Sequence, residues 1–416
     1  APWLAALLFL CICIPVVVQI GPLRLEPYRA LLLLAFPVLL LRWISGGLGP
    51  LRGLDAIVLG YCLWVTTTLF VNHGVPAMIE FSGMFVVEVF GAYLLGRAAV
   101  RSARDYQTVM KTFLLILLVV TPLAAVEALT GSRVFTEIFR GSSASLGLAH
   151  RETRWGMLRA QGPFEHPILY GVVCSLAFAP AFNLVGAGAG LFKRMTLAAV
   201  PVAATFFSLS LGAYLSIMVQ TAMMAADALT RSIRNKWFML LGAGAAVFLA
   251  LEVLSNRGAV VIFIDNFAFN SMAAWTRIAT WEYGSASVMR HPVFGLGFNE
   301  YERPGWLTAS IDNFWLFNAI AHGFPGFLLI AAAFAWVFLR VGFAPVSDPD
   351  VAGHRRGLLF ALAAIAFALC TVQIWKAALT FILLLLGLSV WMLETPPAQN
   401  NAPAPRVSPR RRRTVI

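Results

Sequence analysis

Residues 277–324 contain, in order, the segments Arg277-Ile-Ala-Thr-Trp281, Arg290-His291-Pro292-Val-Phe-Gly-Leu-Gly-Phe298, Ile311-Asp312-Asn313-Phe314-Trp315 and His322-Gly323-Phe324. This stretch is the longer of two polar interruptions in a chain that is otherwise almost entirely apolar. A long segment between membrane spans is uncommon unless it is functional. We therefore interpret the apolar remainder as a scaffold that holds this segment, and a second one around residues 159–170, over a cavity at the membrane surface.

The composition is that of a membrane protein. Of the 416 residues, 60% are hydrophobic and 12% are charged, and the mean hydropathy is +0.80, whereas soluble domains carry about 25% charged residues. The net charge of +12 does not indicate a nucleic-acid partner, because the basic residues lie mostly in short loops between apolar runs. The cysteines all fall inside apolar runs, so we expect neither disulfides nor a metal site.

The apolar runs have the length that a bilayer requires and predict an all-α, polytopic protein with about twelve membrane helices. The expected spans lie near residues 3–20, 28–44, 54–71, 77–99, 112–129, 168–186, 193–208, 211–229, 237–255, 314–340, 356–374 and 377–393. The first run has no basic start and no cleavage site, so a retained span is expected rather than a signal peptide.

The basic residues predict the orientation of the spans, because they favour cytoplasmic loops. Their distribution puts both termini in the cytoplasm and two large loops, at about 130–167 and 256–313, on the outer face, each expected to contain short helices. Residues 1–394 then form the membrane domain. Residues 395–416 form a disordered, basic cytoplasmic tail, whose run of arginines at 410–413 is expected to contact anionic lipid.

The two outer loops are rich in arginine and contain no lysine. Their arginines are Arg133, Arg140, Arg151, Arg154, Arg159, Arg257, Arg277, Arg290 and Arg303. Arginine binds phosphate oxygens through a rigid, permanently charged fork, whereas lysine is a point charge. The pattern predicts a phosphate-bearing ligand at the outer face, although each single arginine is equally well explained by a salt bridge to a loop carboxylate.

The first outer loop ends in Arg159-Ala-Gln-Gly162-Pro163-Phe164-Glu165-His166-Pro167. The Gly-Pro and His-Pro pairs indicate a tight entry into a helix, and Pro167 suits the first turn of that helix. Unpaired N–H groups at a helix start favour an anion, which Arg159 is close enough in sequence to share. Further along, Ser208-Leu209-Ser210-Leu211-Gly212-Ala213-Tyr214 predicts a small-residue break between two helices, with no nearby histidine to activate a serine.

The second outer loop is expected to contain a helix from about residue 270 to 289. Its larger apolar residues form one stripe, Met272, Trp275, Ala279, Ala286 and Met289, which we expect to be buried. Arg277 then points away from that stripe, with Trp281 beside it. Asp312-Asn313 stands where the next span begins and has two compatible interpretations, a helix cap or a carboxylate that accepts a proton from a hydroxyl.

These pieces, in this order, resemble the O-antigen ligase and polymerase family, which includes exopolysaccharide polymerases. The family pattern Arg-x-x-Gly-x-Phe-x-x-Pro is matched by Arg159–Pro167, and its Ser-Arg-Gly-Ala element by residues 210–213. A His-Pro-x-x-Gly-x-Gly turn is matched by residues 291–297, and the closing His-Asn and Gly-x-x-Gly elements by Asp312-Asn313 and by residues 323–326. The resemblance covers residues 110–345 and implies a GT-C-like membrane fold.

The resemblance implies a metal-independent, inverting glycosyltransferase of the bacterial inner membrane, with its active site on the periplasmic face and no cofactor. The donor would be a glycan on polyprenyl diphosphate (undecaprenyl diphosphate), and the acceptor the hydroxyl of another lipid-linked glycan or of a lipid A core. Asp312 would be the base, and Arg159 and Arg277 would hold the diphosphate. Substrate contacts are expected from Arg290, His166, Asn313, Trp281 and Tyr214.

Two residues depart from the family pattern. Leu211 stands where the family often has Arg, so other arginines would have to carry the missing phosphate contact. Asp312 stands where ligases that attach O-antigen to the lipid A core usually have His. Asp-Asn followed by Phe-Trp is closer to the polymerase branch, which makes a polysaccharide polymerase the preferred interpretation.

Two alternatives remain open at this stage. One is O-antigen ligation, and the other is transport or flipping of the same lipid-linked glycan, which would also use arginines on a cavity. Against transport, the spans do not divide into matching halves. The clearest ionisable residue within a span is Glu88, which we expect either to have a function in the membrane or to pair with an arginine of another span.

Overall fold

The structure is a computed structural model, and it describes residues 2–21, 23–139, 152–184, 188–233, 236–266 and 271–393. The predicted basic tail and two of the arginines predicted for the outer face, Arg140 and Arg151, lie outside these ranges. The helices are α1 (Trp3–Ile12), α2 (Pro27–Ile44), α3 (Gly53–Val86), α4 (Ala92–Ala99), α5 (Ala103–Thr130), α6 (Val134–Ile138), α7 (Pro167–Ser175), α8 (Phe178–Phe182), α9 (Leu191–Phe207), α10 (Leu211–Leu229), α11 (Lys236–Leu254), α12 (Ala259–Asn266), α13 (Ser271–Arg290), α14 (Phe314–Trp336), α15 (Pro349–Ala368) and α16 (Lys376–Leu388).

Short π-helical turns, η1 (Val87–Gly91) and η2 (Val337–Val341), continue α3 and α14, and a 3₁₀ turn, η3 (Val390–Leu393), follows α16. Two small antiparallel hairpins are the only sheets among the described residues. They pair β1 (Val18–Ile20) with β2 (Leu23–Leu25) and β3 (Thr153–Arg154) with β4 (Met157–Leu158). The expected all-α architecture is therefore confirmed.

Seven helices of the described chain are long and apolar enough to cross a membrane: Pro27–Ile44, Gly53–Ala99, Ala103–Thr130, Lys236–Leu254, Phe314–Val341, Pro349–Ala368 and Lys376–Leu393. The second of these is 47 residues long and joins two predicted spans, 54–71 and 77–99, through a bend at Gly74. The predicted span at 3–20 contains the shorter apolar helix Trp3–Ile12, and the one at 168–186 contains Pro167–Phe182.

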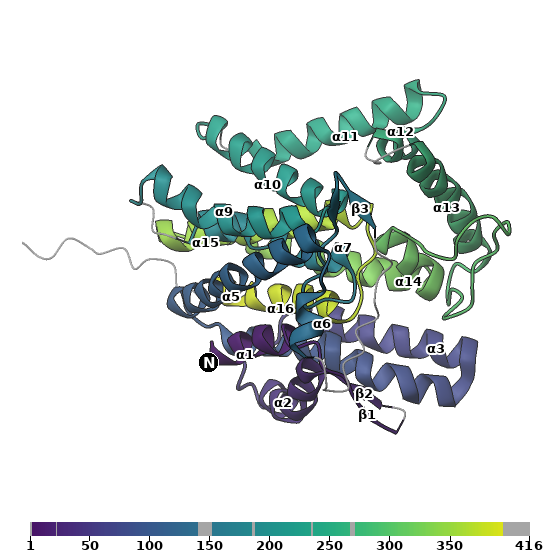
Figure 1. Cartoon of the computed structure of the whole chain (residues 1–416), viewed down its shortest axis with the longest axis horizontal. Coiled ribbons are helices and arrows are strands. Elements are labelled where there is room, and N and C mark those ends of the chain that lie inside the picture. The colour runs from purple at the N-terminus through teal and green to yellow at the C-terminus, as the bar shows by residue number, and fades with distance from the viewer. Residues whose placement is uncertain are drawn as a thin grey trace, which may run out of the picture.

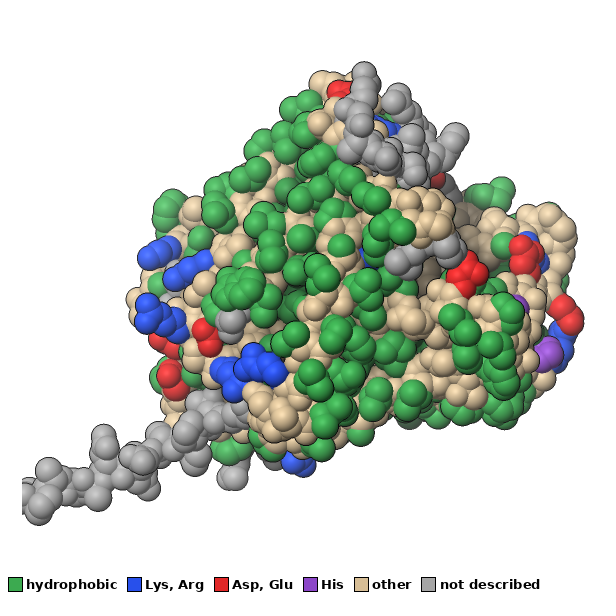
Figure 2. All heavy atoms as spheres, turned by 90° about the horizontal axis from the view of Figure 1, so that it is seen from below, with side chains coloured by type: hydrophobic (Ala, Val, Ile, Leu, Met, Phe, Trp, Pro, Cys, Tyr) green, Lys and Arg blue, Asp and Glu red, His purple; other side chains and the backbone are tan. Residues whose placement is uncertain are grey.

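The helices form a bundle in which α3 packs on α14, α4 on α16, α5 on α9 and α10 on α15. Figure 1 shows most of the long helices running side by side along the long axis of the view, with α12 and α13 at one end. On the face drawn in Figure 2, hydrophobic side chains cover the middle of the molecule and charged side chains gather toward its ends. This is the surface expected of a bundle that is surrounded by lipid.

Two membrane helices break at the same short motif. His73-Gly74-Val75-Pro76 bends α3, and His322-Gly323-Phe324-Pro325 bends α14. Each glycine has a left-handed φ, 76° in α3 and 67° in α14, which a side chain would oppose. The proline two residues later cannot donate a backbone hydrogen bond, so carbonyl groups in the preceding turn are released.

The released carbonyl groups of α14 hold the turn that follows α13. Leu296 N donates to Ile320 O at 2.8 Å, and Gly297 N donates to Ala321 O at 2.9 Å. In return, the Pro292 carbonyl accepts the Phe324 N–H at 2.8 Å. The bend in α14 is therefore the point at which the 291–298 turn is anchored to the membrane bundle.

We expect Gly323→Ala to destabilise the protein. An added Cβ would overlap the Val293 carbonyl oxygen, and the positive φ opposes any side chain; together these cost about 2–4 kcal/mol. The measurement is resistance to unfolding in detergent. Gly83→Ala is the control, because nothing lies within 4 Å of a Cβ added there, and equal resistance of the two variants would contradict the packing described.

The carboxylate of Glu88 pairs with an arginine of another helix, Arg29, which is one of the two outcomes expected for it. It accepts hydrogen bonds from Tyr28 Oη at 2.7 Å and Arg29 Nε at 2.5 Å, both at the start of α2. A second buried pair joins Arg97 Nη1 to Asp55 Oδ2 at 2.5 Å. Each pair ties two segments of the bundle together, so neither carboxylate contributes to the site described next.

Candidate functional site

Residues from five separate parts of the chain line one pocket with a volume of about 550 Å³. Its charged and polar lining includes Glu152, Arg154, Arg159, His166, Ser210, Arg277, Ser310, Asp312 and Gln373. Its apolar lining includes Ile168, Leu211, Phe317, Val372 and Trp375. The pocket therefore combines a cluster of arginines and carboxylates with an apolar wall.

Four helices begin at this pocket. Lining residues stand at or beside the first residues of α7, α10, α14 and α16, which start at Pro167, Leu211, Phe314 and Lys376. The starts of α7 and α14 are capped by side chains, whereas Ser210 before α10 and Trp375 before α16 make no side-chain cap. Free N–H groups and the positive ends of the helix dipoles make such a convergence favourable for an anion.

Arg159 is the most buried of the arginines that line the pocket, with 7% of its surface exposed. Its Nη1 donates to Glu152 Oε2 at 2.6 Å, and its Nε lies 3.4 Å from Ser208 O. Arg154 approaches the same Glu152 oxygen, with its Nη2 at 3.6 Å from Oε2, and donates from Nη1 to Leu209 O at 2.8 Å. Two guanidinium groups thus share one carboxylate at the start of α10.

Arg277 approaches the same pocket from α13. Its Nη2 lies 3.9 Å from Asp312 Oδ2, and the Asp312 side chain is 44% exposed. The Ser310 hydroxyl is 3.4 Å from Asp312 Oδ1. Asp312 is thus an accessible carboxylate beside one cation, whereas Glu152 is held by two.

His166 and Glu152 respond to these charges in opposite ways. Burial, and then the Arg159 charge, lower the pKa of His166, so the imidazole is neutral at pH 7, and its Nδ1 accepts the Ile168 N–H at 3.1 Å. For Glu152, partial burial raises the pKa, but the hydrogen bond and charge of Arg159 and the charge of Arg154 outweigh it and lower the pKa overall. Glu152 therefore remains an anion and is a poor proton acceptor.

Two carboxylates, the buried Glu127 and the partly buried Glu165, fix the loop that carries Arg159 and His166. Glu127, near the end of α5, accepts the backbone N–H groups of Gln161 and Gly162 at 3.2 and 3.1 Å. Glu165 pairs with Lys376 Nζ at 2.5 Å and accepts the Trp375 indole N–H at 3.1 Å. The loop is thus held from α5 on one side and from the start of α16 on the other.

Backbone strain also gathers around the pocket. Within the described ranges, the non-glycine residues with positive φ are Trp155 (51°), Leu209 (46°) and Lys376 (46°), and each is next to a residue that lines the pocket. Such conformations cost about 1–3 kcal/mol each and cluster at functional sites. A scaffold that needed only to span the membrane would have no reason to hold three of them in one place.

The small-residue break at residues 208–213 has a packing role. A Cβ on Gly212 would overlap Val372 Cγ1, and a Cβ on Gly171 would overlap the Ser208 hydroxyl. The absence of these side chains brings the start of α10 against α7 and against the segment before α16. Leu211, the residue that stands where the resembled family often has arginine, lines the pocket, and Arg154 reaches the adjacent Leu209 carbonyl.

The structure brings only some of the predicted site residues together. Arg159, His166, Arg277 and Asp312 line the pocket. The adjacent Asn313 caps α14, its Oδ1 accepting the Leu316 N–H at 3.0 Å, and Tyr214 donates to Phe206 O at 2.6 Å with its ring stacked on Trp155. These two border the pocket without lining it.

Two predicted residues lie elsewhere on α13. Arg290 is paired with Glu302 and is exposed, at the far end of the helix from Arg277. Trp281 packs beside a small apolar cluster that includes Ala279 and Val288. Neither lines the pocket, so the expectation that both contact the same ligand as Arg277 is not supported by the geometry.

Sequence reasoning missed three contributors. Arg154 was named only as one of the loop arginines, Glu152 entered only as one of the loop carboxylates that could pair with them, and residues 372–375 were assigned to a membrane span and the gap after it. A usable signal was present there, because Thr371, Gln373, Trp375 and Lys376 interrupt an apolar run. Within the part of the chain that the structure describes, no group of three or more His, Cys, Asp or Glu side chains is arranged to hold a metal ion.

Comparison with known proteins adds no assignment: the chain matches no protein-family profile, and no curated protein is similar enough in sequence to count as a match.

Proposed function

We propose that this protein is a membrane glycosyltransferase that transfers a glycan from polyprenyl diphosphate to the hydroxyl of a second lipid-linked glycan, and so acts as a polysaccharide polymerase. The observation that carries the proposal is the convergence of Arg154, Arg159 and Arg277 with four helix starts and the Asp312 carboxylate on one pocket. The proposal includes a GT-C-like bundle of about twelve crossings in the bacterial inner membrane, with this pocket on the periplasmic face.

The pocket suits a diphosphate leaving group. When the bond between the anomeric carbon and the diphosphate oxygen breaks, negative charge develops on the diphosphate, and fixed cations stabilise it most where water is excluded. Arg277 and Arg154 are positioned to bind phosphate oxygens, with Arg159 buried behind Glu152. Arg154 compensates for Leu211, because its guanidinium lies at the same helix start.

The proposed glycan transfer needs no reactant besides the donor and the acceptor. The acceptor hydroxyl oxygen attacks the anomeric carbon from the side opposite the diphosphate, the new glycosidic bond forms, and polyprenyl diphosphate leaves with the bonding electrons. The hydroxyl proton passes to Asp312. Direct displacement of this kind inverts the anomeric carbon.

Asp312 suits the role of base better than Glu152 does. Glu152 is held by Arg159 at 2.6 Å and by Arg154 at 3.6 Å, and its lowered pKa makes it a weaker acceptor. Among the described residues, the cation nearest to Asp312 is Arg277 at 3.9 Å, and the Asp312 side chain, which lines the pocket, is 44% exposed. An acceptor hydroxyl can therefore reach Asp312 without displacing an existing hydrogen bond to a guanidinium group.

The test uses the full chain in lipid nanodiscs with an undecaprenyl-diphosphate-linked oligosaccharide, with and without a chelator, and separates the products by size. A ladder of longer glycans that persists in chelator is the expected result. A single transfer that requires added lipid A core would make the protein an O-antigen ligase. Movement of the substrate across the bilayer with no new covalent product would make it a flippase, and either result would overturn the polymerase proposal.

A further inference from the structure

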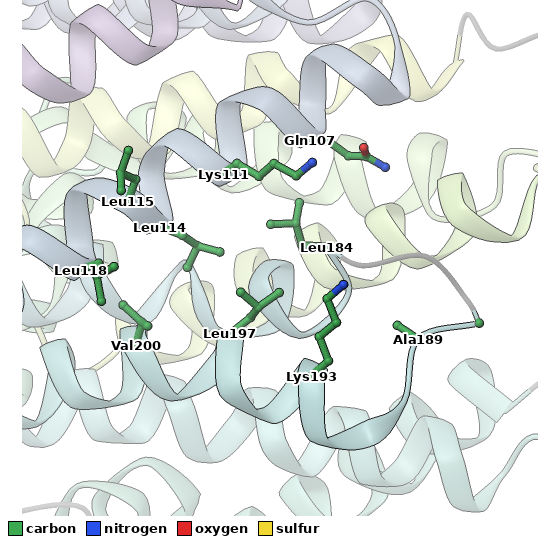
Figure 3. A pocket seen from close by; sticks show the side chains of 11 residues that line it. Gln107, Lys111, Leu114, Leu115, Leu118, Leu184, Ala189, Lys193, Leu197 and Val200 are labelled. Atoms are coloured by element: carbon green, nitrogen blue, oxygen red, sulfur yellow. The ribbon is translucent and has the colours of Figure 1, made fainter.

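A second cavity lies between α5 and α9, apart from the candidate site, and has a volume of about 730 Å³. Its two ends differ in chemistry. Gln107, Lys111 and Lys193 lie at the end where both helices begin, and leucine and valine side chains line the remainder, as Figure 3 shows. The cavity is within the usual size range of small-molecule sites, about 300–1,000 Å³.

The two lysines differ from the other lysines of the chain. Lys236 pairs with Asp227 at 2.6 Å and Lys376 pairs with Glu165 at 2.5 Å. Among the described residues, Lys111 and Lys193 have no ion-pair partner. Two exposed lysines on separate helices thus place positive charge without a carboxylate partner at one end of the cavity, which favours an anionic ligand.

The start of α9 adds to this positive end. Gly190 precedes the helix and offers no side-chain cap, so the N–H groups of the first turn remain available beside Lys193. Arg194 is turned away from this role, because its Nε donates to Ala189 O at 3.2 Å and its guanidinium lies over the Phe182 ring. Backbone N–H groups, a helix dipole and two ammonium groups together match a phosphate.

The other end of the cavity identifies the rest of the ligand. Leu115 and Leu118 are 61% and 56% exposed, and they continue the cavity along α5 away from the lysines, opposite Leu197 and Val200 of α9. A soluble anion would leave this apolar wall uncovered. An acyl chain would cover it, because hydrocarbon is the surrounding solvent at that depth of the bundle.

We propose that the α5–α9 cavity binds an anionic phospholipid of the surrounding membrane. Its phosphate contacts Lys111, Lys193 and the first turn of α9, and one acyl chain lies along Leu115, Leu118 and Val200. The orientation predicted from the basic residues puts this headgroup at the cytoplasmic leaflet, whose anionic lipids favour basic sites. The site does not depend on the proposed glycosyltransferase function.

The experiment measures binding of phosphatidylglycerol to the full chain in detergent by native mass spectrometry, with phosphatidylcholine as the competing zwitterionic lipid. Lys111→Gln/Lys193→Gln is expected to weaken phosphatidylglycerol binding about 10- to 30-fold, since each lysine contributes a factor of about three to five. The matched control is Arg104→Gln/Arg231→Gln, which removes the same charge from exposed positions outside the cavity and should change binding less than twofold. Equal weakening in the control would show that only net charge matters and would overturn the proposal.

A second variant tests the acyl-chain part without changing any charge. Val200→Trp fills the apolar end, and we expect it to weaken phosphatidylglycerol binding to a similar extent while leaving the lysines in place. Unchanged binding in this variant would reject the cavity as the lipid site, as would competition by soluble glycerol phosphate. Thermal unfolding in the same detergent checks that every variant retains its fold. If Val200→Trp does not fold, Val200→Ala replaces it, and we expect a smaller loss of phosphatidylglycerol binding.

Discussion

Arg277→Ala is expected to lower the rate of glycan transfer about 10²- to 10³-fold, the loss seen when one fixed donor to a developing anion is removed. Arg277 Nη2 lies 3.9 Å from Asp312 Oδ2 in the pocket that Arg154 and Arg159 also line. Its removal therefore takes away the one arginine that α13 contributes there. The measurement is single-turnover extension of the lipid-linked oligosaccharide, with donor binding measured separately.

Arg290→Ala is the matched control for this variant. It removes the same side chain from the same helix, but at a position where the arginine pairs with Glu302 outside the pocket. We expect its transfer rate to stay within about threefold of the wild type, because exposed ion pairs contribute at most about 1 kcal/mol. If Arg290→Ala lost as much activity as Arg277→Ala, the diphosphate would have to bind along α13 rather than in the pocket.

Asp312→Asn should lower transfer about 10²- to 10⁴-fold, the usual contribution of a positioned general base. The amide keeps the shape of the side chain and its hydrogen bond from Ser310, which is 3.4 Å away, but it cannot accept the hydroxyl proton. Donor binding should be retained or tightened, because the pocket becomes more positive. The rate of a single turnover and the donor affinity, measured on the same preparation, separate these two effects.

Glu152→Gln distinguishes the two carboxylates of the pocket. We expect at most a tenfold loss of turnover, since Glu152 holds Arg154 and Arg159 and does not receive the proton. A result in which Glu152→Gln abolishes transfer while Asp312→Asn leaves it intact would exchange the two assignments. A loss of activity that arises from misfolding would be detected in either variant as lower resistance to unfolding in detergent.

The sequence was sufficient for the position of α13 but not for its packing. A helix was expected at about 270–289, and α13 spans Ser271–Arg290. The predicted buried stripe was wrong at its large residues, because Met272, Trp275 and Met289 are 68%, 52% and 69% exposed, whereas its member Ala279 is buried. The buried face consists instead of small residues, and a Cβ on Gly284 would lie 3.0 Å from both Ile320 and Leu316 of α14.

The reason is physical. Periodic large apolar residues identify a helix face whose bulky side chains fill a core. Helices in membrane proteins instead approach one another most closely where their side chains are small. Gly284 lets the backbone of α13 come close to α14, and the small residues Ala274 and Ser287 are buried on the same helix. That close approach also explains why Arg277 is brought to Asp312.

The same distinction applies to the candidate site. Arg159, His166 and Asp312 were found from local motifs because each stands at or near the start of a helix. Arg154 and Trp375 were not found, because their places depend on contacts with Leu209 and Glu165, which are distant in sequence. Arg290 was grouped with Arg277 although 13 residues of helix separate them by about 20 Å.

The convergence of helix starts has a consequence for biosynthesis. The arginines of the pocket lie on segments that leave the ribosome long before Val372, Gln373 and Trp375, which complete its wall. Until α16 is inserted, Glu165 has neither Lys376 nor Trp375 as a partner, and the start of α10 has no Val372 to pack against. A partly synthesised chain therefore carries the charges of the site without an enclosed pocket, and insertion of the α15–α16 pair is the step that completes the wall of the pocket.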